Sequence, residues 1–109
     1  MLTKKVLLLL ESGPSTFKVQ VIISTRNPYT GETLTSAREY KMKIGEKTSI
    51  AETMMDGADF GFDGDGFDVY LNSKPSWVSI SYEGDNIVAT LTSKPQGETV
   101  IKLDANYIN

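Results

Sequence analysis

Residues 17–24 read Phe-Lys-Val-Gln-Val-Ile-Ile-Ser, and this stretch decides the fold class. Apolar side chains fall at every second position from Phe17 to Ile23, with mostly polar residues between them. Successive side chains of a β-strand point to opposite faces, so the pattern predicts a strand with one buried face. Ile22 is the exception, because it adds an apolar side chain to the second face.

Similar stretches recur along the chain, separated by turn residues such as Gly, Pro, Asn and Asp. Strands are predicted over residues 5–11, 17–24, 38–44, 67–72, 77–82, 87–92 and 99–105. In the third of these, Tyr40, Met42 and Ile44 are expected to share one face. About seven strands at regular spacing are typical of an all-β sandwich. We therefore predict a single domain over residues 1–109, an immunoglobulin-like β-sandwich with at most one short helix.

Residues 49–55 are the place where a helical turn competes with a strand. Ser49-Ile50-Ala51-Glu52 matches a capping box, and Gly57 stands where a short helix would end. Thr48, Ile50 and Thr53 are β-branched, which favours a strand instead. The sequence leaves both interpretations open.

The composition excludes several kinds of catalytic site. The chain has 109 residues, enough for one domain with its own core, and it contains no cysteine and no histidine. Disulfides, thiolate metal sites, zinc sites and Ser–His triads are therefore excluded. Since the commonest general base is also missing, we expect a protein that is not an enzyme and needs no cofactor.

The charge balance argues against nucleic acid as a partner. The net charge is −3, from 11 basic and 14 acidic residues, whereas a nucleic-acid binder usually carries a basic patch. The apolar run over residues 6–10 is too short for a signal peptide or a membrane span, and Glu11 follows it directly. We expect no membrane association and no export signal.

An acidic, glycine-rich segment over residues 56–68 is the first candidate site. Clustered carboxylates on a sharply turning backbone suit a hard cation such as Ca²⁺. The candidate ligands are Asp59, Asp63, Asp65 and Asp68. An EF-hand loop starting at Asp59 fails, because its twelfth position is Tyr70 rather than Glu. The alternative is a solvated loop whose acids keep it soluble, and the prediction for metal is therefore none.

Aromatic residues in the loops predict a contact surface. Phe60 and Phe62 lie among the acids of this segment, and exposed apolar patches often mark interfaces. We assign both to partner binding, together with Tyr29 in the polar loop that follows the strand at 17–24. Phe67 is expected to belong to the core, as is Trp77, which follows Pro75-Ser76 at the start of a strand.

The C-terminal third of the chain resembles a known family. Residues 74–82 read Lys-Pro-Ser-Trp-Val-Ser-Ile-Ser-Tyr, residues 84–91 read Gly-Asp-Asn-Ile-Val-Ala-Thr-Leu, and residues 99–103 read Thr-Val-Ile-Lys-Leu. Together they resemble the end of a BACON domain, a Bacteroidetes-associated immunoglobulin-like module. The chain departs from the family at Glu98, where an Arg usually precedes the Thr, and the first 70 residues do not match well. The resemblance implies a sandwich and a carbohydrate or mucin ligand.

Two functions follow from these observations. The first is a structural protein, an accessory (auxiliary or decoration) protein of a bacteriophage capsid, assembled in the host cytoplasm and located in the virion. Its partner would be the major capsid protein or another virion protein in a symmetric assembly, contacted through loops 26–37 and 56–68. An adhesive sandwich without cysteines or export signal fits that setting.

The alternative is a carbohydrate-binding, BACON-like adhesion module, extracellular or at the cell surface. Such a module needs exposed aromatic platforms for sugar rings. The candidates are Tyr29, Tyr70, Tyr82 and Tyr107.

Overall fold

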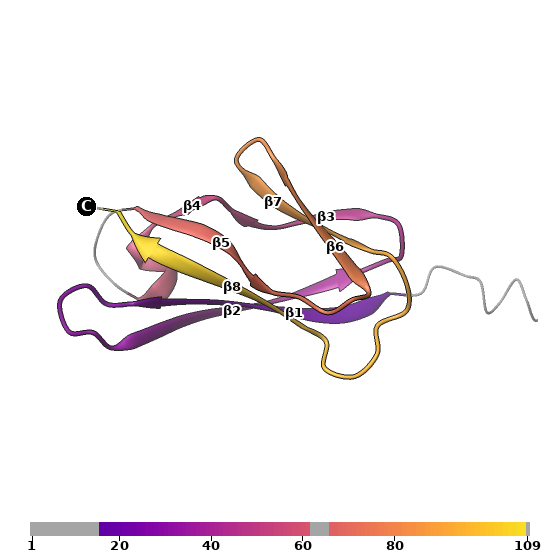
Figure 1. Ribbon diagram of the computed structural model, residues 1–109, viewed down its shortest axis with the longest axis horizontal. Helices are drawn as coiled ribbons and strands as arrows, with labels where there is room; N and C mark the ends of the chain where they lie inside the picture. Colours follow the sequence, from indigo (N-terminus) through magenta and orange to yellow (C-terminus); the bar gives the residue numbers. More distant parts are fainter. Residues whose placement is uncertain (1–15, 62–65, 109) are drawn as a thin grey trace, which may run out of the picture.

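The computed structural model describes residues 16–61 and 66–108, and it arranges them in two β-sheets (Figure 1). The elements in chain order are β1 (Phe17–Arg26), β2 (Thr33–Met42), β3 (Lys47–Glu52), β4 (Met54–Met55), the 3₁₀ turn η1 (Gly57–Phe60), β5 (Phe67–Ser73), β6 (Val78–Glu83), β7 (Asn86–Leu91) and β8 (Val100–Tyr107). One sheet has the order β2-β1-β8-β5-β4 and the other β3-β7-β6. The predicted β-sandwich is confirmed, with eight described strands where the sequence indicated about seven.

Strand β1 lies inside the larger sheet and is paired on both sides. It pairs antiparallel with β2 over all ten residues, from Phe17 opposite Met42 to Arg26 opposite Thr33. On its other side it pairs parallel with β8, from Gln20 opposite Val100 to Ser24 opposite Asp104. The predicted alternation is confirmed, because Val19, Val21 and Ile23 are fully buried.

The two sheets share one apolar core. Its fully buried large side chains come from both sheets: Val19, Val21, Ile23, Met42, Ile50, Phe67, Val78, Ile87, Leu91, Ile101 and Leu103. Each of these strands alternates inward and outward residues, so their inner rows meet between the sheets.

Both aromatic core predictions are confirmed. Trp77 is only 5% exposed, and its indole Nε1–H donates a hydrogen bond of 3.2 Å to the Gln96 carbonyl. Phe67 is fully buried, with ring centroids 5.1 Å from Phe60 and 5.4 Å from Tyr107 in tilted contacts. Such tilted aromatic pairs add to the stability that burial alone provides.

Residues 47–52 and 54–55 form strands, with a bend at Thr53 between them, so the helical interpretation of this region is wrong and the strand alternative is correct. A bulge between Ser49 and Ala51 lets both Ile50 and Ala51 face the core. The Tyr40 hydroxyl donates to the Ile50 carbonyl at 3.0 Å, which ties β2 to this bulge. Burial and pairing with β7 therefore override the local capping signal.

The helical turn comes later, at η1. The Asp59 carboxylate accepts a hydrogen bond of 3.3 Å from the Asp56 backbone N–H, as in a capping box. Gly61 ends the turn with a φ of 71°, a left-handed conformation that favours glycine.

Strand β2 begins at Thr33, before the predicted start at Arg38, so the expected loop over 26–37 shortens to residues 27–32. Ile44 is also misplaced by the prediction. It lies beyond the end of β2 and is half exposed, because the chain crosses to β7 there and the Gly45 N–H donates to the Leu91 carbonyl. The strand predicted over residues 5–11 lies outside the described residues.

An exposed ion pair lies on the outer face of the smaller sheet. Lys47 of β3 and Glu83 of β6 meet at 2.8 Å, on either side of β7, and Val88 lies between their strands with little exposure. The Lys47 ammonium lowers the pKa of the Glu83 carboxyl, by hydrogen bonding and then by its charge, against an opposing desolvation.

No helix in the described part of the chain is long and apolar enough to cross a membrane.

We predict that Phe67→Ala lowers the free energy of unfolding by about 3–5 kcal/mol, because it leaves a cavity between Phe60 and Tyr107. Urea denaturation followed by tryptophan fluorescence measures the change. Ile44→Ala is the matched control and should cost no more than about 0.5 kcal/mol at its exposed position. A Phe67→Ala variant as stable as the control would contradict the core described above.

Candidate functional site

The predicted calcium ligands are only partly within the described residues. Asp59 lies on η1, 4.0 Å from the Arg38 guanidinium. Asp68 lies on the outward row of β5, opposite Asn106 of β8. Asp63 and Asp65 lie outside the described residues. Within residues 16–61 and 66–108, no three acidic side chains gather into a group that could hold a metal ion.

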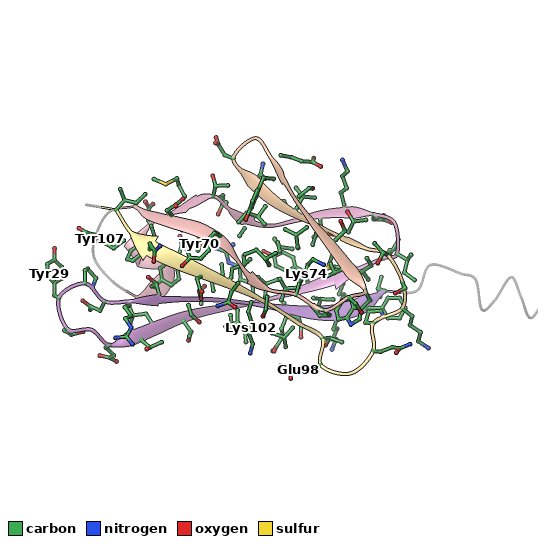
Figure 2. All side chains as sticks on the ribbon, in the orientation of Figure 1. Tyr29, Tyr70, Lys74, Glu98, Lys102 and Tyr107 are labelled. Carbon is green, nitrogen blue, oxygen red and sulfur yellow. The ribbon has the colours of Figure 1, made fainter. Side chains whose placement is uncertain are left out.

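The predicted partner-binding residues have different environments. Phe60 is 5% exposed and packs on Phe67, so its ring belongs to the core and offers little surface to a partner. Phe62 lies outside the described residues. Tyr29 is 78% exposed at the loop between β1 and β2, the one predicted contact residue that the structure places on the surface among those it describes (Figure 2).

The Tyr29 loop is internally ordered. The Asn27 Oδ1 accepts hydrogen bonds from the backbone N–H groups of Tyr29, at 2.9 Å, and of Thr30, at 3.3 Å. An Asn side chain that bonds the backbone two residues on fixes an Asx-turn. The Asn27 carbonyl also accepts from the Gly31 N–H, where a φ of 76° requires glycine. The loop therefore presents Tyr29 from a defined turn.

A hollow of about 440 Å³ opens where β1 and β8 separate. Their parallel pairing ends at Ser24 and Asp104, although both strands continue beyond that point. The gap is spanned by the buried Thr25, whose hydroxyl donates to the Ala105 carbonyl at 2.6 Å. We call this hollow the fork. It is lined by Ser24, Thr25, Arg26, Pro28, Thr33, Tyr70, Asp104, Ala105, Asn106 and Tyr107.

The fork combines two tyrosine side chains with several polar groups. Tyr70 of β5 lies directly opposite Asp104 of β8, and both belong to the outward rows of their strands. The Asn72 side-chain amide donates to the Asp104 carboxylate, which holds that side chain in place. Arg26 contributes a guanidinium at the end of β1. Tyr70 and Tyr107 lie toward the same end of the molecule as Tyr29 (Figure 2).

This arrangement can receive a ligand. An open hollow lined by two tyrosines, Tyr70 and Tyr107, and by several polar groups can receive a ligand that both stacks and accepts or donates hydrogen bonds. Asp104 is the one carboxylate among the residues that line the fork.

Sequence reasoning named Tyr70 and Tyr107 but missed Arg26, Asp104 and Asn106. Asp104 and Asn106 alternate with Leu103 and Ala105, so their outward direction could be read from the sequence. The fork itself could not, because it depends on where a parallel pairing between distant segments ends.

Tyr82 has a structural role. Although 56% exposed, it accepts a hydrogen bond at its hydroxyl from the Leu71 backbone N–H at 3.2 Å. Since Leu71 belongs to β5 and Tyr82 to β6, this bond joins the two sheets.

Comparison of the chain with protein-family models gives no match. Searches among curated proteins and among solved structures likewise give no match. The resemblance of the C-terminal third to BACON domains therefore stays a hypothesis.

We predict that Tyr82→Phe lowers the free energy of unfolding by about 0.5–1.5 kcal/mol, the usual net value of one hydrogen bond. The Leu71 amide should also exchange with solvent faster, which NMR-detected hydrogen exchange measures. The Val69 amide is the internal control, since it donates to the Thr53 carbonyl at 2.9 Å and should be unaffected. Unchanged exchange at Leu71 would show that the tyrosine does not join the sheets.

Proposed function

We propose that this protein is a non-enzymatic interaction protein, and that it serves as an accessory protein of a bacteriophage capsid. Support comes from Tyr29, which is 78% exposed on a loop whose turn is held by Asn27. Large aromatic side chains on ordered loops are frequent anchors of protein contacts, because they bury much area for little loss of conformational entropy.

The composition agrees with this proposal. The chain has no cysteine and no histidine, so its fold needs no oxidising compartment and offers few catalytic groups. The proposed partner is the major capsid protein or another virion protein, contacted around the loop at 27–32. Many copies in a symmetric shell would multiply one modest contact into stable attachment. The proposed location is the virion, after assembly in the host cytoplasm.

A specific observation favours a second function, carbohydrate binding in an extracellular or cell-surface setting. The fork places Tyr70 opposite Asp104, beside Arg26 and Asn106, in an open hollow of about 440 Å³. Sugars offer apolar C–H faces that stack on aromatic rings and hydroxyls that bond carboxylates and amides. The two functions are compatible, because Tyr29 does not line the fork.

Quantitative mass spectrometry of gradient-purified particles tests the accessory function. We expect the chain at a fixed molar ratio to the major capsid protein, because symmetric binding sites fix the number of copies. Tyr29→Ala should reduce that ratio, whereas Lys94→Ala, at another exposed loop position, should leave it unchanged. Particles that lack the chain while cells or medium contain it would refute this function.

A glycan array followed by titration calorimetry tests carbohydrate binding. If a glycan binds, Tyr70→Ala should weaken binding by about tenfold or more because it removes the ring on which the sugar stacks. Asp104→Asn should weaken binding by a similar factor because it removes a charged hydrogen-bond acceptor. Asp68→Asn is the matched control, since Asp68 faces outward from β5 but does not line the fork. Equal losses in all three variants would place the ligand elsewhere.

A further inference from the structure

Strand β2 is an edge strand with unusual regularity. Its ten residues pair with β1 without a register shift, and they include no proline and no glycine. The other described edges are protected: β4 has two residues, β3 carries a bulge, and the Lys74 ammonium donates to the Val78 carbonyl of β6. Short strands, bulges and lysines are the usual means of blocking edge-to-edge pairing. Strand β2 is long and has no bulge, and Lys41 near its end is its one lysine.

The outward backbone groups of β2 can be identified from the loop beside it. The Asn27 N–H donates to the Glu32 carbonyl, so these two residues form a hydrogen-bonded pair of the hairpin. Such pairs alternate along an antiparallel ladder, so the next one joins Thr25 to Leu34, and every second pair after it is hydrogen-bonded as well. Gln20 belongs to the other set, and its N–H indeed points away from β2, to the Thr99 carbonyl. The N–H and C=O groups directed to the free edge are those of Thr33, Thr35, Ala37, Glu39 and Lys41.

These five residues are exposed, and no other residue in the described part of the chain hydrogen-bonds to their backbone groups. Their outward N–H and C=O groups, repeated at every second position of the strand, form a template that another strand can complete.

We propose that a second copy of this chain completes it, with the two β2 strands antiparallel about a twofold axis at Ala37. In this register Thr33 lies opposite Lys41, and Thr35 lies opposite Glu39. Ala37 lies opposite its own copy, where a small side chain is the least obstructive. Every outward backbone group of the strand is then paired, and no like charges face each other.

Charge disfavours the registers with the axis at Arg38 or Glu39, and an axis at Ser36 would leave Lys41 opposite Gly31, beyond the start of β2. A twofold axis at Arg38 or at Glu39 would set identical charges directly opposite each other, which destabilises a cross-strand pair. In the proposed register Arg38 faces Ser36 of the second copy, and its own charge is already near the Asp59 carboxylate. The two five-stranded sheets would join into one sheet, continuous across both copies. This inference does not depend on the proposed function.

Sedimentation velocity on the full chain tests the proposal. We expect a concentration-dependent species of twice the chain's mass. Ala37→Glu and Ala37→Lys should each raise the dissociation constant by about tenfold or more, because two like charges meet at the axis. Mixing these two variants should restore the dimer, since a glutamate of one copy then faces a lysine of the other. Ala37→Thr, the neutral control, should remain dimeric.

A second variant tests the backbone directly. Ala37→Pro removes one N–H that the hairpin does not use, so it should weaken the dimer while circular dichroism stays that of the native fold. A chain that is monomeric at every concentration would overturn the proposal. A dimer that persists equally in both charge variants, or that mixing does not restore, would also overturn it.

Discussion

The parallel pairing of β1 with β8 is the constraint on which the rest of this structure depends. It joins the first described strand to the last, and it places β1 in the interior of the larger sheet. The inward residues Val21, Ile101 and Leu103 are fully buried because both strands are held at this register. A shift of one residue would turn every inward side chain of β8 to the outer face, so burial fixes the register.

The same pairing creates the candidate site where it ends. Beyond Ser24 and Asp104 the two strands continue without a shared ladder, and the Thr25 hydroxyl bonds the Ala105 carbonyl across the gap. A polar side chain is tolerated in that buried position because its hydrogen bond is made. The position of the fork is therefore set by the backbone. The side chains of Tyr70, Arg26 and Asn106 supply its aromatic and polar groups.

The sequence predicts the features that depend on residues close together along the chain, such as a strand and its buried face. The alternation from Phe17 to Ile23 indicated β1 and its buried face, and Trp77 after Pro75-Ser76 indicated a core aromatic. The capping pattern at residues 49–52 misled, because pairing with β7 and burial of Ile50 outweigh a local preference. Phe60 was expected at the surface because acidic residues surround it in the sequence. Its ring packs on Phe67 instead, a contact that the neighbouring residues in the sequence do not reveal.

The alternation of inward and outward side chains separates much of the surface of this domain from its core. Outward residues such as Tyr70, Asp104 and Asn106 alternate with inward residues such as Val69, Leu103 and Ala105, which are buried. Because the side-chain period of a strand is two, an exchange on the outer row leaves the packing of the inner row intact. Tyr70, Asp104 and Asn106 of the fork lie on this outer row, whereas Thr25 and Ala105, which also line the fork, are buried. Substitutions at these outward positions of the fork are therefore expected to cost little stability.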